Sequence, residues 1–383
     1  MAVVTQRESG VWQAKVRRKG WPSQSKTFPR KGDAEAWARA VEREMDVGAF
    51  INRDDAERTT FQEAADRYVR EVLPGKRAQV QPRYMLARLC DHFGKYSLAS
   101  ISAAMLASYR DERLKTVSNQ TVVHELGLIT RVLKACQLDW GIALPQGIAT
   151  QQIRKPKVSN GRERRLEAGE ESLLLNALRV KKEPWAHAAV VLAIETAARQ
   201  SELISLTWED VDLKRRVARL RGKGGGVTKS GDDYRDVPLS PRAIQVLTDL
   251  PRSLNGQVLP ISQNALRLTW DRALVSARKA HLHSSLEALL AAAGVDDPAR
   301  EIRALVYKKR APLETTSRLW TELQRTDKSL TDLHFHDCRH EATSRLAEKL
   351  QMHELMKVTG HKSSTMLSRY YHPRAEDLAA KLA

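Results

Sequence analysis

The sequence predicts a multidomain α+β protein. It should have a small N-terminal β-sheet plus one helix, a helical middle domain, and a mostly helical C-terminal domain with a small antiparallel sheet. Three observations support this fold. The length of 383 residues corresponds to two or three domains of ~150 residues each. Apolar and polar residues alternate at 11–16, as in a half-buried strand, and most later segments carry apolar residues at helical spacing. The expected boundaries are 1–56, 57–152, a basic linker at 153–165, and 166–383.

Composition and charge narrow the class of protein. Lys and Arg outnumber Asp and Glu by 64 to 46, a net charge of +18. This excess favours a polyanionic partner, since phosphate contacts supply most non-specific affinity for DNA, although a basic protein with solvated faces also fits. The three cysteines (Cys90, Cys136 and Cys338) are widely spread, form no disulfide framework or CxxC metal pair, and fit a reducing compartment. The chain shows no signal peptide and no apolar run near the ~20 residues that span a bilayer. We therefore expect a cytoplasmic protein.

The first 56 residues should form a sheet with one helix packed on it. A second strand at 23–28 follows a turn at 18–20, and Asp33 is the expected cap of the helix. Basic residues concentrate in the sheet, and a β-sheet can enter the DNA major groove. A solvated basic hairpin explains the charge equally well. The candidate DNA-binding residues are Lys15, Arg17, Arg18, Lys19, Lys26, Arg30 and Lys31.

Residues 57–152 read as an independent helical domain with short links. Thr60 and Glu63 have the spacing of a capping box at the start of the first helix. Further helices are expected near 81–93, after Ser102, and at 119–138. Their apolar stripes should form the core, and no catalytic cluster is visible in this segment.

A linker at 153–165 reads IRKPKVSNGRERR and has six basic residues against only Glu163. Its Pro, Gly, Ser and Asn residues break regular structure. The linker could lie along a duplex backbone or act as a solvated hinge. Arg154, Lys155 and Lys157 are the candidate DNA contacts here.

The C-terminal domain should begin with helices around a buried one at 185–198, which is apolar nearly all round. Arg199 and Glu202 follow it and would share one face of a helical turn, where a plain salt bridge is the simpler interpretation. Strands are expected at 216–220 and 234–239. The glycine-rich connection between them carries Lys223 and Lys229 but lacks the order of a nucleotide-binding P-loop.

Two helices should follow, one starting at Ser240-Pro241 and one spanning about 262–282. The segment 284–330 holds a small Leu/Ala-rich helix, a basic run and a Pro-broken stretch. The sequence suggests no chemistry for this segment.

Most of the chemistry lies in one stretch near the end, 333–372. His336 and Arg339 are three residues apart, His361 follows a glycine, and Tyr370 comes nine residues later. Three side chains that bind phosphate and one phenol in a short run indicate phosphoryl chemistry with a tyrosine nucleophile.

A metal site in the same stretch is the alternative. His334, His336, Cys338 and His340 lie close together, and the last histidine pair has the i,i+4 spacing of zinc helices. Arg339 lies inside this group and would repel a cation, and the glutamate of a zinc-protease helix is absent. We therefore expect a phosphate group here and no metal.

Five motifs appear in one order: TAARQSEL, VTKSGDDYRDVPLS, HFHDCRHEAT, VTGHKSS and SRYYH. In this respect the segment from about 164 to 383 resembles the catalytic domain of the tyrosine recombinase (phage integrase) family. The helical domain resembles the family's core-binding domain. The N-terminal sheet resembles the arm-binding domain of integrases, and these two likenesses rest on order and pattern.

The resemblance implies a role for each motif residue. Glu202 would orient the site, and Tyr370 would be the nucleophile, with Tyr371 one residue out of register. His336 could accept the phenolic proton, and Lys229, in preference to Lys223, would protonate the leaving 5′-hydroxyl. The implied catalytic set is Arg199, Lys229, His336, Arg339, His361 and Tyr370.

The activity implied is site-specific recombination of a mobile or invertible DNA element. Strands would be cut and rejoined through a 3′-phosphotyrosyl link that conserves the bond energy, so no metal and no other cofactor is expected. The family works as a homotetramer on double-stranded DNA sites, through a Holliday junction. Accessory DNA-bending proteins are possible partners, in the bacterial cytoplasm at the nucleoid.

The sequence departs from the family pattern in three places, and two rival functions stay open. Ala197-Ala198 stands where the family often has Gly-Leu, and Cys338 where it often has Leu; both keep small or apolar packing. The segment 284–330 is longer than the usual connection.

A type IB topoisomerase shares the same catalytic logic, and a non-catalytic DNA-binding regulator could keep the fold alone. The arm-like domain disfavours the first, and the complete catalytic set disfavours the second.

Overall fold

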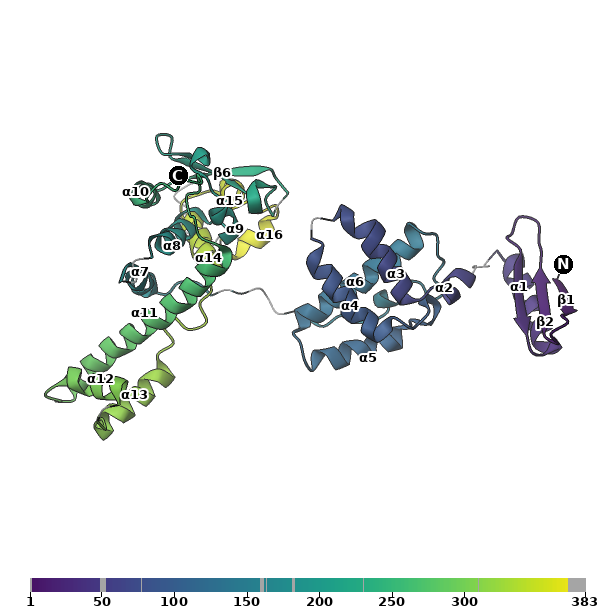
Figure 1. The fold of residues 1–383 in the computed structure, drawn as a ribbon, viewed down its shortest axis with the longest axis horizontal. Helices are drawn as coiled ribbons and strands as arrows, with labels where there is room; N and C mark the ends of the chain where they lie inside the picture. The colour runs from purple at the N-terminus through teal and green to yellow at the C-terminus, as the bar shows by residue number, and fades with distance from the viewer. Residues whose placement is uncertain are drawn as a thin grey trace, which may run out of the picture. The chain divides into compact units, whose positions relative to one another are not determined.

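The computed structural model describes most of the chain in two compact units, residues 1–160 and 161–383 (Figure 1). Each unit is described here on its own. The described residues are 2–48, 53–76, 78–158, 162, 164–180, 183–229, 231–308 and 310–370.

The first unit begins with a three-stranded antiparallel sheet in the order β1-β2-β3, which packs against α1. Alternation along β2 directs Ala14 and Val16 into the core under this helix, where both are fully buried. The first strand was not predicted, because its five residues, AVVTQ, show no clear alternation of apolar and polar side chains. The four elements are β1 (Ala2–Gln6), β2 (Trp12–Val16), β3 (Gln24–Phe28) and α1 (Lys31–Asp46).

The predicted cap of α1 is wrong. The N-cap residue is Arg30, and Asp33 lies in the first turn of the helix. A carboxylate in the first turn interacts favourably with the helix dipole, so Asp33 still stabilises the helix from within its first turn.

The rest of this unit is helical around a second apolar core, which contains Phe61, Phe93 and Leu126. The predicted capping box is present: the Thr60 hydroxyl accepts from the Glu63 amide, and the Glu63 carboxylate accepts from the Thr60 amide at 2.8 Å. The described α-helices are α2 (Asp54–Arg58), α3 (Phe61–Arg67), α4 (Val80–Phe93), α5 (Ala103–Leu114) and α6 (Asn119–Leu138).

The first part of the basic linker is bound to this helical region through its backbone. Arg110 donates to the carbonyl of Arg154 at 2.8 Å, and Asn119 donates to the carbonyl of Lys157 at 2.7 Å. The side chains of Arg154, Lys155 and Lys157 are exposed. The backbone is therefore fixed while these cationic groups face solvent.

The second unit surrounds a nearly all-apolar helix, α8, which packs against α7, α10 and α14. A second three-stranded antiparallel sheet, β4-β5-β6, lies beside it, with β5 and β6 forming the predicted hairpin. The elements up to the hairpin and its following helix are α7 (Glu170–Val180), α8 (Pro184–Thr196), α9 (Gln200–Ile204), β4 (Val211–Asp212), β5 (Val217–Arg221), β6 (Tyr234–Pro238) and α10 (Pro241–Asp249).

The segment 284–330 forms a helical extension of this unit. The helix expected to end near 282 continues to Ala292, and two helices pack on its far half (Figure 1). Leu282, Leu286 and Leu290 are buried there, which explains why the helix does not stop. The remaining helices are α11 (Gln263–Ala292), α12 (Pro298–Tyr307), α13 (Glu314–Thr326), α14 (Phe335–Ala347), α15 (Met352–Thr359) and α16 (Ser364–Leu367).

The structure confirms the predicted fold class, a mostly helical chain with two small antiparallel sheets. Within the described part of the chain, no helix is both long and apolar enough to cross a membrane.

Candidate active site

Helix α14 carries much of the candidate site. His336, Arg339, His340 and Thr343 share one face, because residues three and four apart lie over one another on a helix. Asp337 fixes the start of this helix by accepting from the amide of His334 at 2.7 Å.

Asp337 is fully buried and also accepts two hydrogen bonds of 2.8 Å from Arg162. Two more linker arginines bind acidic groups of the same unit: Arg164 pairs with Glu170 at 2.6 Å, and Arg165 pairs with Glu341 at 3.1 Å. The second part of the basic linker therefore binds protein carboxylates, in contrast to the exposed cations of its first part.

Arg199 and Glu202 form the salt bridge that their spacing suggested, and they do so at the start of a helix. Arg199 is the N-cap of α9, and the Glu202 carboxylate accepts from its backbone amide at 2.9 Å and from its guanidinium at 2.7 Å. The Arg199 guanidinium binds Oε1 of this carboxylate, and the Arg235 guanidinium, on β6, donates to Oε2 at 2.7 Å. Burial alone would raise the pKa of Glu202, but Arg235 and Arg199 outweigh it and hold that pKa below its usual value.

Two buried guanidiniums bind the C-terminal ends of two helices. Arg339 donates to the carbonyl of Ala197, after α8, and to that of Thr359, at the end of α15, at 2.6 Å. Arg235 donates to the carbonyls of Ala197, at 3.4 Å, and Val358. Cations at helix C-termini satisfy carbonyls that have no partner within the helix.

Ala197 has a left-handed backbone, with φ of 51°, a conformation that costs an ordinary residue ~1–2 kcal/mol. It ends α8 and carries the carbonyl shared by the two arginines. Burial, with Arg199 and Arg235 nearby, lowers the pKa of Arg339 to about 9, so its guanidinium is still charged at neutral pH.

His361 is held by the residue two before it. The Thr359 hydroxyl lies 2.6 Å from the Leu355 carbonyl and 2.7 Å from His361 Nδ1. A hydroxyl has one proton, and a carbonyl can only accept, so the hydroxyl donates to Leu355 and accepts from Nδ1–H. Gly360 supplies the left-handed turn between them, with φ of 68°. In neutral His361, Nε2 then carries the lone pair.

Tyr370 lies against His340. The Tyr370 hydroxyl contacts His340 Nδ1, and the two rings stack with their centroids 5.8 Å apart. The His336 and His340 rings are nearly perpendicular, with their centroids 5.1 Å apart. Sequence reasoning assigned the proton acceptor to His336 and considered His340 only as a metal ligand, so this contact was missed.

His336 stands at the mouth of the site with an exposed side chain. Desolvation by the surrounding protein lowers the pKa of His336, and the neighbouring His340 and Arg339 lower it further, to about 4. A neutral imidazole at physiological pH follows.

The hairpin between β5 and β6 carries Lys229 to the same place. Thr228 and Asp232 close the turn, with the Thr228 amide donating to the Asp232 carbonyl at 2.7 Å. Lys362, beside His361, pairs with Asp232 at 3.3 Å and links the hairpin to the loop after α15. The side chain of Lys223 lies outside the described residues, as do Tyr371 and His372.

These elements enclose a cavity of about 610 Å³. All six predicted catalytic residues line it, although they lie as far apart in the chain as Arg199 and Tyr370. Glu202, which pairs with Arg199, does not itself line the cavity. The lining residues are Arg199, Gln200, Ser201, Lys229, Gln263, His336, Arg339, His340, Thr343, Gly360, His361, Lys362, Met366 and Tyr370.

Comparison with known proteins shows the family. Residues 164–377 match the phage integrase family. The chain belongs to the phage integrase family. A shufflon-specific DNA recombinase of Escherichia coli is 32% identical over 334 residues, which cover 83% of this chain and 70% of that protein.

Solved integrase structures share the fold of this family member. The Tn1549 transposon integrase (residues 82–397), solved with circular intermediate DNA, matches with a TM-score of 0.58 and 17% identity, over 85% of this chain and 99% of that one. A lambda integrase tetramer bound to a Holliday junction matches with a TM-score of 0.54 and 15% identity, over 97% and 95% of the two chains.

The four residues considered for a metal do not converge in this integrase-family chain. Cys338 is completely buried in the core under α8, where burial raises the pKa of its thiol, while His334 is exposed at the helix start. Among the described residues, no group of three or more His, Cys, Asp or Glu side chains is placed to hold a metal ion.

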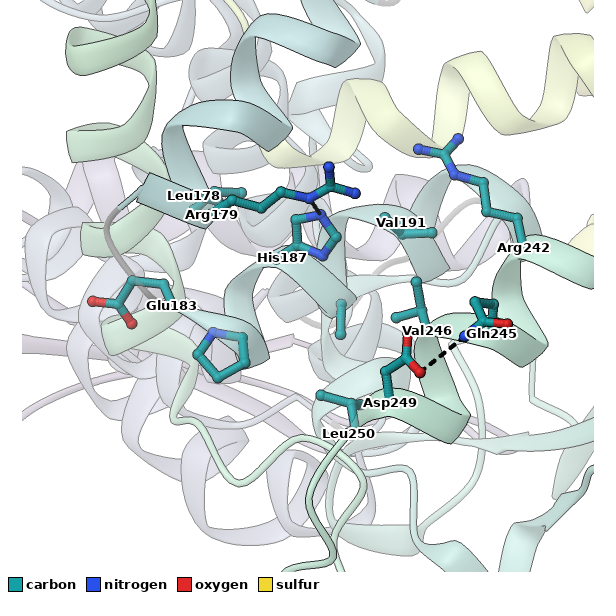
Figure 2. A pocket seen from close by; sticks show the side chains of 12 residues that line it. Leu178, Arg179, Glu183, His187, Val191, Arg242, Gln245, Val246, Asp249 and Leu250 are labelled. Atoms are coloured by element: carbon teal, nitrogen blue, oxygen red, sulfur yellow. Dashed lines mark hydrogen bonds between the residues drawn. The ribbon is translucent and has the colours of Figure 1, made fainter.

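A second cavity, of about 590 Å³, lies between α7, α8 and α10 (Figure 2). It is lined largely by apolar groups such as Leu178, Val191 and Leu250. His187 faces it and lies 3.2 Å from Arg179 Nε, and burial with Arg179 and Arg242 lowers its pKa. None of the predicted catalytic residues lines this cavity.

The predicted DNA-binding residues of the N-terminal sheet do not all lie on one surface. Lys15 pairs in register with Val3 and Ser25, on the face opposite the core residue Ala14, whereas Lys26 pairs with Ala14 and belongs to the face that packs on α1. Of the others, Arg18 pairs with Asp46 and Lys31 with Glu35 at 3.7 Å, while Arg17, Lys19 and Arg30 are exposed.

Proposed function

We propose that this protein is a site-specific DNA recombinase that cuts and rejoins DNA through a 3′-phosphotyrosyl intermediate. The observation that carries the proposal is the single cavity lined by two arginines, a lysine, two histidines of the predicted set and Tyr370. This set matches the chemistry of attack on a phosphodiester, and the family membership of the chain supports it.

Arg199 and Arg339 are the proposed partners of the non-bridging phosphate oxygens. Attack builds negative charge on these oxygens, and guanidinium groups bind such oxygens in bidentate geometry. Arg199 is oriented by Glu202, and Arg339 by two backbone carbonyls, so both charges are in position before the substrate arrives. Protonated His361 would add a hydrogen bond from Nε2–H, since its Nδ1–H is held by Thr359.

The covalent step exchanges one ester for another. The Tyr370 oxygen gives its proton to a base and bonds to phosphorus as the bond to the 5′-oxygen breaks. Lys229 gives a proton to the leaving 5′-oxygen. Religation reverses each transfer. Because one phosphoester replaces another, the strand can be rejoined without a nucleotide cofactor.

The N-terminal unit supplies the proposed grip on DNA. We assign residues 1–56 to an arm-type DNA-binding domain, 57–152 to a core-binding domain, 153–165 to a basic linker, and 166–383 to the catalytic domain. The polar face of the first sheet, with Lys15, and the exposed cations Arg154, Lys155 and Lys157 of the linker support this assignment.

A relative's structure supports a proposal about assembly. The lambda integrase is a tetramer on a Holliday junction in its structure, so we propose a homotetramer on two duplexes for this chain. We also propose that it works at the nucleoid with accessory DNA-bending proteins. Its reaction would integrate, excise or invert a DNA element. A relative that is a shufflon-specific DNA recombinase supports the recombinase class in general.

The test uses nicked suicide duplexes that carry candidate sites, incubated with the full chain without metal. A covalent protein–DNA adduct is expected, and Tyr370→Phe should abolish it while Tyr371→Phe keeps it. An adduct that persists in Tyr370→Phe and vanishes in Tyr371→Phe overturns the assignment of the nucleophile.

Two other outcomes point to the rival functions. Binding of a site without any adduct indicates a non-catalytic DNA-binding regulator. Relaxation of supercoiled DNA without preference for a site indicates a type IB topoisomerase.

A further inference from the structure

The histidine that contacts the tyrosine hydroxyl is not a member of the predicted catalytic set. His340 lies one helical turn beyond His336 on α14, and its Nδ1 meets the Tyr370 oxygen while the rings stack at 26°. We propose that His340 is the general base that takes the proton of Tyr370 during strand cleavage. This inference rests on the proposed function and adds a residue to it.

Geometry favours His340 over His336 for this role. A general base must lie within hydrogen-bond reach of the proton that it removes. The Tyr370 hydroxyl contacts His340 Nδ1, whereas the His336 ring lies edge-on to the His340 ring, with centroids 5.1 Å apart, and its side chain is exposed. From that position it can face the phosphate.

Burial favours a base supplied by the protein. His340 is 9% exposed, the Tyr370 side chain is partly buried, and the Tyr370 hydroxyl contacts the His340 ring directly. The α14 backbone holds the ring rigidly, because Ser344 donates to the His340 carbonyl at 3.2 Å and the next turn is buried in the core.

The surrounding charges assist the transfer. Arg199, Lys229 and Arg339 line the same cavity, and positive charges close to a phenolate stabilise it. These charges therefore favour loss of the Tyr370 proton to His340 as phosphorus is attacked.

The step balances in both directions. The phenolic O–H bond breaks as the oxygen–phosphorus bond forms, and the proton moves to Nδ1, which must be unprotonated, with the ring hydrogen on Nε2. The 5′-oxygen leaves with a proton from Lys229. On religation the imidazolium returns its proton to the Tyr370 oxygen.

The experiment measures single-turnover adduct formation on a nicked suicide duplex, with DNA binding measured in parallel. His340→Asn is the decisive variant, since its amide oxygen can still accept a hydrogen bond but cannot take a proton. A loss of about 100-fold or more is expected, with unchanged DNA binding. His353→Asn, an exposed histidine on α15, is the matched control and should cleave at the wild-type rate.

A second measurement separates base catalysis from positioning of the ring. When Tyr370 is replaced by difluorotyrosine, whose phenol is more acidic, the His340→Asn loss should shrink at least tenfold, and the rate of His340→Asn should rise with pH. Added imidazole should partly restore the His340→Ala variant. An equal loss with both phenols and at every pH would mean that His340 only positions the ring.

The two proposals fail in different ways. If the wild-type chain forms no adduct through Tyr370, the proposed function fails. If the wild-type adduct forms but His340→Asn cleaves within about threefold of it, the recombinase assignment stands and His340 is not the base. A His340→Gln variant serves as a second comparison if His340→Asn does not bind DNA.

Discussion

Arg235 donates a hydrogen bond to Glu202 over 2.7 Å, and both side chains are almost closed to solvent, at 7% and 1% exposed. Glu202 in turn holds Arg199, so the position of a predicted catalytic arginine depends on a guanidinium that does not line the cavity. The sequence showed Arg235 only as part of the strand motif YRDVPL. Its role comes entirely from tertiary structure.

Replacing Arg235 with Met should destabilise the protein strongly. A buried carboxylate would lose one of its two guanidinium partners, which costs ~3–5 kcal/mol in free energy of unfolding. Urea-induced unfolding measures this. The control is Arg219→Met on the neighbouring strand, where the Arg219–Asp236 pair at 2.9 Å is exposed, and a change below ~1 kcal/mol is expected. Equal effects of the two substitutions would contradict the buried pair.

Replacing Thr359 with Val should slow cleavage modestly. The variant keeps the shape of the side chain but removes the acceptor for His361 Nδ1–H, and one such hydrogen bond is worth ~0.5–1.5 kcal/mol, or about 2- to 10-fold in rate. Thr359→Ser should restore the wild-type rate. The tautomer of His361 is measured directly by ¹⁵N NMR, and a proton on Nε2 in the neutral wild-type ring would show this account to be wrong.

Glu125 should make the stability of the helical domain depend on pH. It is fully buried, and burial alone would raise its pKa, but hydrogen bonds from Arg113 and Tyr109, each 2.8 Å, outweigh that effect and the pKa is lowered. A lowered pKa stabilises the folded state above the unfolded value of ~4.3, and this stabilisation is lost as pH falls through the folded value.

The Glu125→Gln variant should therefore lose ~3 kcal/mol at pH 7, and its difference from wild type should shrink below about pH 4. Urea unfolding at several pH values follows this. Glu112→Gln, an exposed residue on α5, should change stability by less than ~0.5 kcal/mol at any pH. A difference that grew on acidification would have the wrong sign for this explanation.

Lys15 and Lys26 should differ in their effect on DNA affinity. Lys15 lies on the open face of the N-terminal sheet and Lys26 on the face that packs against α1. If the open face meets the duplex, Lys15→Ala should weaken binding and reduce the slope of log affinity against log salt by ~0.9. Lys26→Ala should leave the slope nearly unchanged. The reverse ranking would place the DNA on the other face.

Local patterns predicted much of this fold. The capping box at Thr60, the helix at 119–138 and the β5–β6 hairpin all follow from periodicity and turn residues that lie within a few positions of each other. The same holds for four residues in the stretch from His336 to Tyr370. Their types and spacing already indicated phosphate chemistry.

The missed features all depend on long-range contacts. Strand β1 exists because β2 pairs with it, and α11 runs to Ala292 because α12 and α13 cover its second half. The contact of Tyr370 with His340 spans 30 positions, where sequence spacing gives no distance. In the sequence, the i,i+4 pair of His336 and His340 also suggested a metal site, which drew attention away from the phenol.

The carbonyls that hold Arg235 and Arg339 belong to Ala197, Val358 and Thr359. Every one of these acceptors is a main-chain atom, which no substitution can delete. During evolutionary drift, a lineage can exchange the side chains at these three positions while both guanidiniums keep their partners. A substitution at Ala197 would change the side chain and the cost of the left-handed backbone, and would leave in place the carbonyl that two arginines share.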